Sequence, residues 1–275
     1  MSSPILRFAP SPNGLLHLGH AFSALFTWRA AAQLGGATLL RIEDIDTARC
    51  KPEFDAAIRE DLAWLGLSWP EPVLRQSDRF DVYRDAARRL GDLLYPCTCT
   101  RTEIAARARS TDPDGAPLYD GHCRHHGARP GLPVQWRLKM DEALLRSTDL
   151  PISEWPIAGV DLGDAPMPRA AEPGRWGDAV IVRKDTPTSY HLSVVVDDAA
   201  QGITHVTRGR DMEASTDIHV LLQLLLGLEQ PIYTFHKLIL DDEGNKLSKS
   251  KGSPTLRSLR ESGWTAADVR AAVGF

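Results

Sequence analysis

The first fifty residues hold the pattern that most constrains the fold. Residues 5–8 (ILRF) predict a short buried strand, a turn broken by proline and glycine follows, and residues 18–34 have the apolar spacing of a helix. Gly35 and Gly36 end that helix, and residues 38–42 (TLLRI) predict a second strand. A strand, a helix and a strand in this order form a βαβ unit, in which the crossover is right-handed and the first turn lies at the carboxyl edge of a parallel sheet. We therefore expect an α/β fold built on a parallel sheet.

The remainder of the chain alternates between periodic and irregular parts. Helices are predicted from Pro52 through residues 54–67 and over about residues 79–94, whereas the following eighty residues are rich in proline, glycine, histidine and arginine and have few periodic segments. Regular pattern returns at residues 179–184 and 191–198, before a buried helix at 218–228 and a strand at 234–240. The predicted division is 1–94 for the first half of the α/β domain, 95–178 for an insertion, 179–245 for the second half of the domain, and 246–275 for a basic loop with a C-terminal helical segment.

Composition and charge exclude several classes of protein. The 275 residues are 43% hydrophobic and 25% charged, which is typical of globular domains rather than of disordered or fibrous chains. No apolar run reaches the length of a membrane span and the N-terminus has no charged-then-apolar leader, so we expect no membrane association and a cytoplasmic location. A net charge of −4 argues against a protein that is basic all over, but not against a local basic patch.

The turn after the first predicted strand, PSPNGLLHLGH, has the features of a phosphate site. The start of a helix exposes unpaired backbone N–H groups at the positive end of the helix dipole. Gly14 permits a tight turn, Gly19 permits close approach of a flat group, and His17 and His20 share one side of the helix start, where they can donate to phosphate oxygens. The alternative is that the two histidines only cap the helix or lie on the surface beside the loop.

A second motif, KLSKS at residues 246–250, follows the turn DDEGN near the other end of the chain. Two lysines and two serines suit a triphosphate, although such a cluster is more often a solvated loop. The pair H-x-G-H and K-x-S-K-S resembles the paired signatures of class I aminoacyl-tRNA synthetases. RFAPSPNGLLHLGH, RIEDID and HLSVVVDD resemble stretches of glutamyl-tRNA synthetases, and the likeness runs from Ile5 to about Ser253. With no helical anticodon-binding domain following and a cysteine-rich insertion, the chain is similar to the glutamyl-Q tRNA(Asp) synthetases.

The resemblance implies a Rossmann-like parallel sheet with a zinc-containing insertion, a short helical C-terminal segment and no anticodon-binding domain. It also implies that the chain activates L-glutamate with ATP to glutamyl-adenylate without tRNA. The glutamate is then transferred to queuosine in the anticodon loop of tRNA(Asp). The expected ATP-binding residues are His17, Gly19, His20, Lys246 and Lys249, with His17, His20 and Lys249 catalytic. Mg²⁺ is expected to accompany ATP, although no dedicated site is visible, and the protein is expected to act as a monomer.

For the glutamate pocket, the resemblance points to Arg7 and Arg208 with the Tyr190 hydroxyl beside them, to Glu43 for the substrate ammonium, and to Ala9 and Ser11 in the first turn. Arginine suits this task because its planar fork pairs with a carboxylate through two hydrogen bonds. An amide in the same place would leave a buried guanidinium unpaired. The alternative for Arg7 and Glu43 is a structural ion pair between neighbouring strands.

The insertion carries the candidate metal ligands. Cys97 and Cys99 form a C-x-C pair and Cys123 follows, so three thiolates are available to a zinc ion that takes four ligands. The resemblance implies Tyr119, in Y-x3-C, as the fourth ligand of a structural zinc. His122, His125 and His126 are chemically better ligands, and three reduced cysteines packed without metal remain the other alternative. Cys50 is expected to be a lone thiol.

The acceptor is the least specified part of the sequence. Arginines cluster in the insertion and its flanks, but acids are interleaved, so a solvated mixed-charge surface is an equal alternative to an RNA-binding face. They are Arg84, Arg88, Arg89, Arg101, Arg107, Arg109 and Arg124. The basic tail after Lys246 is a second candidate face. Competing functions are a truncated glutamyl-tRNA synthetase that acylates the tRNA 3′ end, a silent RNA-binding paralogue, and a ligase or nucleotidyltransferase acting on free amines.

Overall fold

The computed structural model describes residues 3–147, 149–240, 244, 247 and 253–275. Lys246 and Lys249, both predicted to bind ATP, lie outside the described residues. None of the helices in the described part of the chain is long and apolar enough to cross a membrane.

The predicted βαβ unit is confirmed. Strand β1 (Ile5–Phe8) leads through the turn into helix α1 (Leu18–Gln33), and strand β2 (Ala37–Ile42) returns parallel to β1. Gly35 has a left-handed φ of 63°, and a Cβ built on Gly36 would lie 2.3 Å from the Pro4 carbonyl oxygen. The two glycines therefore end the helix and let the chain pass close to the start of β1.

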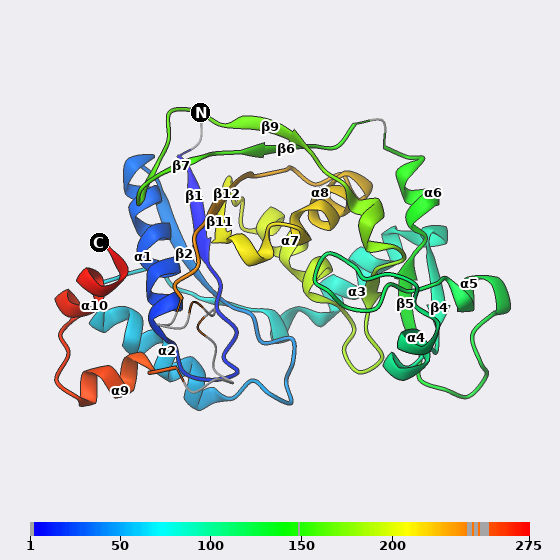
Figure 1. Ribbon diagram of the computed structural model, residues 1–275, viewed down its shortest axis with the longest axis horizontal. Coiled ribbons are helices and arrows are strands. Elements are labelled where there is room, and N and C mark those ends of the chain that lie inside the picture. Colours follow the sequence, from blue (N-terminus) through cyan, green and yellow to red (C-terminus); the bar gives the residue numbers. More distant parts are fainter. Residues whose placement is uncertain (1–2, 148, 241–243, 245–246, 248–252) are drawn as a thin grey trace.

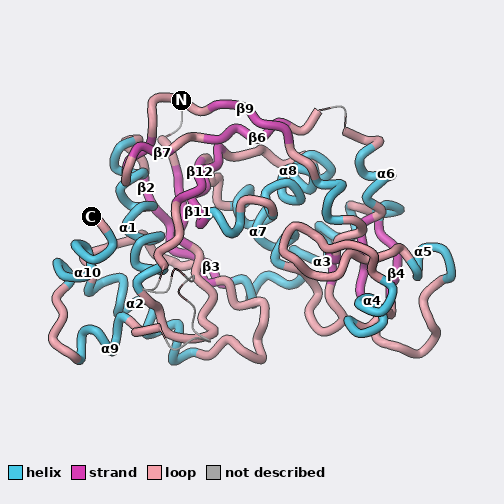
Figure 2. The backbone as a smooth tube through the Cα atoms, viewed as in Figure 1, coloured by secondary structure: helices cyan, strands magenta, loops and turns pink. Residues whose placement is uncertain are grey.

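The central sheet is assembled from distant parts of the sequence (Figures 1 and 2). One group of strands has the order β1–β2–β3 and a second has the order β11–β12–β6–β9. The Thr204 N–H, just before β11, donates to the Ile5 carbonyl at 2.9 Å, which sets β11 beside β1. Within these two groups, every strand pairing is parallel except that of β9 with β6. The additional strands are β3 (Leu74–Arg75), β6 (Pro151–Glu154), β9 (Met167–Ala170), β11 (His205–Gly209) and β12 (Ile232–His236).

The chain order reverses between β1 and β11, because β2 lies on one side of β1 and the later strands lie on the other. In open parallel sheets such a switch point opens a crevice at the carboxyl ends of the strands, where ligands bind. This topology agrees with the predicted Rossmann-like α/β fold.

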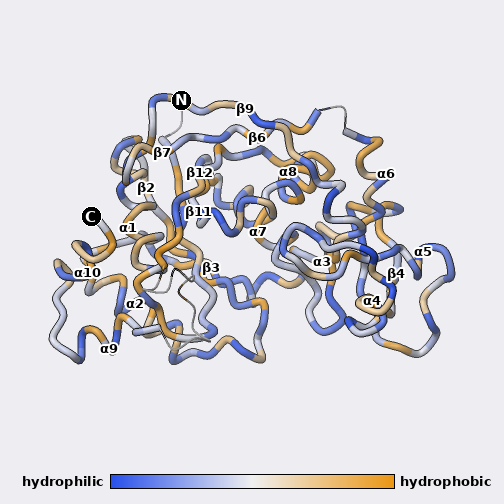
Figure 3. The backbone as a smooth tube through the Cα atoms, in the orientation of Figure 1, coloured by the Kyte–Doolittle hydropathy of each residue, from blue (hydrophilic) through white to orange (hydrophobic). Residues whose placement is uncertain are grey.

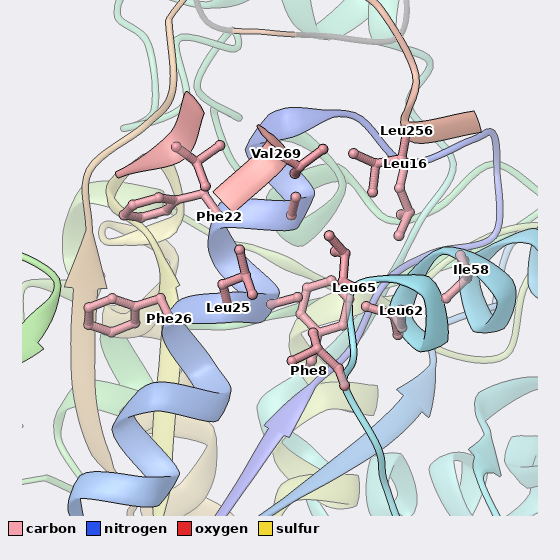
Figure 4. Packing of buried hydrophobic residues seen from close by; sticks show 14 of the residues in the cluster. Phe8, Leu16, Phe22, Leu25, Phe26, Ile58, Leu62, Leu65, Leu256 and Val269 are labelled. Carbon is pink, nitrogen blue, oxygen red and sulfur yellow. The ribbon is translucent and has the colours of Figure 1, made fainter. Parts of the chain in front are cut away.

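Outside the insertion, six described helices accompany α1, which packs on β1, β2 and β11. They are α2 (Pro52–Trp64), α3 (Phe80–Arg89), α7 (Tyr190–Ala200), α8 (Ser215–Leu226), α9 (Leu256–Glu261) and α10 (Ala266–Val273). Figure 4 shows Leu256 and Val269, from the C-terminal helices, packed with Leu16, Phe22 and Leu25 of the first turn and α1. The short helical C-terminal segment is thus part of the main hydrophobic core and not a separate unit.

The insertion forms a smaller layer at the other end of the molecule (Figure 1). Its antiparallel sheet has the order β10–β5–β4, and the hydrophilic colour of its outer helix α5 shows in Figure 3. Its elements are β4 (Leu94–Cys97), α4 (Arg101–Arg107), α5 (His122–His126), β5 (Gln135–Leu138), α6 (Met140–Leu144) and β10 (Val180–Val182), while β7 (Ile157–Ala158) and β8 (Asp161–Leu162) form a short hairpin against α1.

Strand pairing crosses the predicted division of the chain. Strand β6, within residues 95–178, joins the central sheet beside β12, and β10, within residues 179–245, joins the small sheet beside β5. The division itself stays a prediction, but residues 95–178 give β6 and its neighbour β9 to the central sheet, and residues 179–245 give β10 to the small sheet.

Two elements end differently from the prediction. The helix expected to reach residue 94 ends at Arg89, because Gly91 takes a left-handed φ of 53° and strand β4 begins at Leu94. The strand predicted over residues 234–240 ends at His236. Residues 191–198, where the sequence shows regular pattern, lie in helix α7, which has buried valines and packs on α3, α8 and β10.

Candidate active site

A cavity of about 440 Å³ lies at the switch point, where β1, β2, β11 and β12 end. It is lined by each of the nine predicted ATP- and glutamate-binding residues that the structure describes: Arg7, Ala9, Ser11, His17, Gly19, His20, Glu43, Tyr190 and Arg208. Leu247, the described residue between the two predicted lysines, lines the same cavity, and its N–H donates to the Ile239 carbonyl at 3.3 Å. Residues from both ends of the chain therefore meet in one cavity.

The two histidines of HLGH lie against each other at the start of α1, where each ring accepts a hydrogen bond from the backbone. The Gly19 N–H donates to His17 Nδ1 at 3.1 Å, and the His17 N–H donates to His20 Nδ1 at 3.2 Å. The rings lie 3.9 Å apart between centroids, and a Cβ on Gly19 would lie only 3.0 Å from the His17 ring. Because each Nδ1 accepts a backbone proton, the neutral rings carry their own proton on Nε2. The histidines thus cap the helix and line the cavity at once.

Arg7 and Glu43 lie in the cavity wall, but they form no ion pair with each other among the described residues. Arg7 Nε donates to Asp198 Oδ1 at 3.0 Å, and Arg41 Nη2 lies 2.7 Å from the same oxygen. Glu43 pairs instead with Arg41, at 3.3 Å. Burial would raise the pKa of Asp198, but the two guanidinium groups outweigh it and hold that pKa below its ordinary value. For Glu43, burial outweighs Arg41 and Arg7 and raises the pKa.

Arg208 stands in a different environment at the end of β11. Its Nη1 lies 2.9 Å from His219 Nδ1 and 3.4 Å from Thr216 Oγ1, and its guanidinium lies 5.3 Å from the Tyr233 ring centroid. Tyr190, the first residue of α7, borders the cavity beside it, and burial raises the pKa of the Tyr190 phenol. Both cavity arginines are therefore in place to meet an anion, but only Arg7 is paired with a carboxylate within the described residues.

Several residues at or near the cavity were not predicted from the sequence. His236 Nε2 lies 3.0 Å from Ser23 Oγ, and Lys237 follows it at the end of β12. Asp198, which lies behind the cavity wall, had no predicted role either, although it accepts hydrogen bonds from Arg7 and Arg41. The rule that parallel strands end at one edge could have placed His236 and Lys237 there. The prediction that the strand continued to residue 240 hid that signal.

The predicted metal ligands also come together, away from the cavity. The Sγ atoms of Cys97, Cys99 and Cys123 all lie within 4.8 Å of one another, and all three residues are buried. The Tyr119 hydroxyl lies 3.4 Å from Cys97 Sγ and 3.8 Å from Cys99 Sγ. Within the described residues the histidines of α5 do not belong to this group. Three clustered thiols with a phenol oxygen match the number and chemistry of ligands that zinc takes, so the residues fit the ion.

Charged neighbours complete the cysteine cluster. Arg137 Nε lies 3.4 Å from Cys97 Sγ with its guanidinium 3.9 Å from the Tyr119 ring centroid, and Arg107 Nη2 lies 3.3 Å from Cys99 Sγ. Such donors stabilise thiolate ligands and orient them. Cys50 lies outside the cluster, with its Sγ 3.5 Å from Ser11 Oγ, as expected for a lone thiol.

A second cavity, of about 640 Å³, opens between the insertion and α7. Tyr190 lines both cavities, so the two adjoin at this residue. The walls of the second cavity carry Arg101, Arg183 and Lys184 and the indole of Trp176. Lys184 Nζ is anchored to the carbonyls of Thr98 and Cys99, at 2.9 and 3.1 Å, which ties this wall to the cysteine cluster.

Known proteins match this arrangement over nearly the whole chain. The glutamyl-Q tRNA(Asp) synthetase of Rhodobacter capsulatus is 48% identical over 286 residues, covering 98% of this chain and 100% of that protein. The glutamate–tRNA ligase of Aquifex aeolicus is 38% identical over 96% of this chain and 55% of its own length. A crystal structure of a glutamate tRNA ligase from Elizabethkingia meningosepticum, in complex with its amino acid, has a TM-score of 0.69 at 28% identity, over 96% of this chain and 54% of that chain. The chain thus spans about half the length of these ligases.

The match to a family model decides the assignment. The model for tRNA synthetases class I (E and Q), catalytic domain, covers residues 5–269. Residues 5–269 include the strand, turn and helix that carry HLGH, the cysteine cluster and both cavities. The chain therefore belongs to the family of class I tRNA synthetase catalytic domains (E and Q).

Proposed function

We propose that this enzyme activates L-glutamate with ATP in the absence of tRNA and transfers it to queuosine in the anticodon loop of tRNA(Asp). The observation that carries the proposal is the cavity at the switch point. It brings the HLGH turn, both candidate glutamate-binding arginines and Leu247 of the KLSKS segment to one place. The relative that matches this chain over 100% of its own length bears the name of the same reaction.

In the first step a glutamate carboxylate attacks the α-phosphorus of ATP, and pyrophosphate leaves. The protein forms no covalent bond; it positions the reactants and stabilises the charge that builds on phosphate oxygens. The protonated Nε2 atoms of His17 and His20 serve as donors to those oxygens at the start of α1. Lys249, with Lys246, serves as the cation for the β- and γ-phosphates. Mg²⁺ supplies further charge when it accompanies ATP.

Glutamate is proposed to lie between the two arginines of the cavity and the side chains of Glu43 and Tyr190. Arg208 and Arg7 meet its carboxylates, Glu43 meets its ammonium, and the Tyr190 hydroxyl lies beside them. Backbone and hydroxyl groups of Ala9 and Ser11 complete the pocket in the turn after β1.

The second step is proposed to draw its acceptor from the second cavity, which shares Tyr190 with the first. A vicinal diol such as that of queuosine's cyclopentene ring attacks the adenylate carbonyl, and AMP leaves. Arg101, Arg183 and Lys184 are suited to RNA phosphates. The 3′-terminal adenosine of tRNA also carries a diol, so acylation of the 3′ end is the alternative.

Zinc is proposed to have a structural role in the insertion. Cys97, Cys99 and Cys123 would hold it, with the Tyr119 oxygen as the fourth ligand. The bound ion would tie the turn after β4 to α5 and, through Lys184, would brace the wall of the second cavity.

The deciding experiment is ATP–pyrophosphate exchange with glutamate, with and without total tRNA, followed by transfer of labelled glutamate to tRNA. Exchange without tRNA and label on queuosine, located by mass spectrometry of the nucleosides, support the proposal. Exchange that requires tRNA, with label on the terminal adenosine, would favour a 3′-acylating enzyme. No glutamate-dependent exchange under either condition would refute the proposed activity.

A further inference from the structure

The two arginines of the active-site cavity differ in what balances their charge. Arg7 donates to the carboxylate of Asp198, so a negative charge already faces its guanidinium. Arg208 is equally buried, with 7% of its surface exposed against 6% for Arg7, but within the described residues it forms no ion pair. Its hydrogen-bonding partners there are a histidine nitrogen and a threonine hydroxyl, which are both uncharged groups.

Arg208 also retains a donor for a ligand. Its Nε is buried and has no hydrogen-bond partner among the described residues. Nε and Nη2 form one of the two edges by which a guanidinium binds a carboxylate through parallel hydrogen bonds. An unpaired buried donor costs stability, and Arg208 lines the cavity, where a ligand could supply the acceptor group.

The partner of Arg208 belongs to a chain of two imidazoles. A guanidinium has no acceptor, so His219 Nδ1 must accept from Arg208 Nη1 over their 2.9 Å contact, and the ring proton of His219 must lie on Nε2. His219 Nε2 lies 3.2 Å from His191 Nδ1 and donates to it, which fixes the His191 proton on Nε2 as well. Both rings are therefore neutral, each in one tautomer.

The surroundings keep these rings uncharged. His219 is fully buried on α8, and burial, with Arg208 next, lowers its pKa well below the ordinary value. The groups that face it are Arg208 from β11, Arg7 from β1, and Tyr190 and His191 from α7. The cations oppose a charge on the ring, and no carboxylate among the described residues hydrogen-bonds to it.

We propose that His219, backed by His191, is a positioning residue that holds Arg208 through a neutral acceptor and so leaves its full charge for the substrate. Arg208, rather than the compensated Arg7, then selects the anionic side-chain carboxylate of glutamate over the amide of glutamine. A carboxylate at position 219 would orient the Arg208 guanidinium equally well. Its negative charge, however, would cancel the positive charge by which Arg208 distinguishes glutamate from glutamine. This inference rests on the proposed function and adds to it the determinant of side-chain selection.

The test compares His219→Asn with His219→Asp. The two side chains have the same size, and each places an oxygen near the position of His Nδ1, but only aspartate brings a charge. We expect His219→Asn to keep the KM for glutamate within about threefold of wild type and to keep the preference for glutamate over glutamine. We expect His219→Asp to raise the KM by about ten- to a hundredfold, the range for a hydrogen bond to a charged group, and to lose much of the preference.

Two further measurements make the outcomes separable. Urea unfolding of both variants shows whether each is folded, and nitrogen-15 spectra of the histidines in the wild-type protein report which ring nitrogen of His219 carries the proton. A protonated Nδ1, or equal KM values and preferences in folded Asn and Asp variants, would overturn the role of His219 while the wild type still activates glutamate. If the wild type fails to activate glutamate at all, the proposed function is wrong and the substrate assigned to Arg208 is wrong with it.

Discussion

Arg7 and Asp198, which lie 191 residues apart in the chain, are joined by a buried 3.0 Å hydrogen bond between Nε and Oδ1. Arg41 donates to the same carboxylate at 2.7 Å, so one acid balances two buried guanidinium groups. We predict that Asp198→Asn lowers the free energy of unfolding by about 3 to 5 kcal/mol, because it leaves the buried Arg7 without its counterion and Arg41 with Glu43 alone. Urea unfolding measures this loss. Asp85→Asn, which breaks an exposed pair with Arg88, serves as the control and should cost no more than about 1 kcal/mol.

The pH dependence of stability should reflect His191. Burial, followed by the charge of Arg208, lowers the pKa of His191 from 6.5 to about 4 in the folded chain. Between these values the unfolded chain binds a proton that the folded chain does not, so stability is intact above about pH 6.5 and falls as the pH drops towards 4. At pH 5 this group should cost about 2 kcal/mol relative to pH 7.

His191→Gln should therefore reduce the difference in unfolding free energy between pH 7 and pH 5 by about that amount. His125→Gln is the control, because the His125 side chain is exposed and in water both before and after unfolding. An unchanged difference in the His191 variant would show that the ring is already charged in the folded protein at pH 5.

The sequence predicts features that depend on neighbouring residues better than features that depend on tertiary packing. The βαβ unit depends on spacing within forty residues, and its strands and helix were predicted to within a residue or two. The partners of Arg7 and Arg208 depend on tertiary packing. Asp198 on α7 contacts Arg7, and His219 on α8 contacts Arg208, and no spacing in the chain connects them with β1 or β11. Periodicity also could not show that β6 and β10 would each pair with the sheet of the other region.

Replacing a cysteine that binds zinc should remove the ion, whereas replacing a cysteine outside the thiol cluster should not. We predict that the wild-type chain retains one zinc ion after dialysis, that Cys99→Ser loses it, and that Cys50→Ser retains it, because Cys50 lies outside the thiol cluster. Elemental analysis gives the metal content. Limited proteolysis should cut Cys99→Ser faster within residues 108–131, whereas the core formed by α1, α9 and α10 stays protected. Equal zinc content in the two serine variants would contradict the assignment of the ligands.

Transfer to tRNA should depend on the second cavity, and activation should not. Arg183 lines that cavity and pairs with Asp185 at the surface. We predict that Arg183→Ala leaves tRNA-independent exchange with glutamate unchanged but weakens binding of tRNA and lowers the slope of log affinity against log salt by about 1, the effect of losing one phosphate contact. Arg29→Ala, whose side chain pairs with Asp161 on the β7–β8 hairpin, is the control. An equal effect of both substitutions on tRNA binding would place the RNA elsewhere.

The lysines of KLSKS provide the sharpest test of activation. Lys249 is proposed to meet the charge that develops on the β- and γ-phosphates, where losing one well-placed donor costs about a hundred- to a thousandfold in rate. We predict that Lys249→Ala loses exchange by at least that factor while its unfolding midpoint and its affinity for glutamate alone stay near those of wild type, since the proposed glutamate pocket is built from β1, β11 and α7. Lys251→Ala removes the same charge two residues further along and should retain most exchange. Near-normal exchange in Lys249→Ala would remove this lysine from the chemistry, and equal losses in the two variants would indicate a general effect of positive charge rather than one aimed donor.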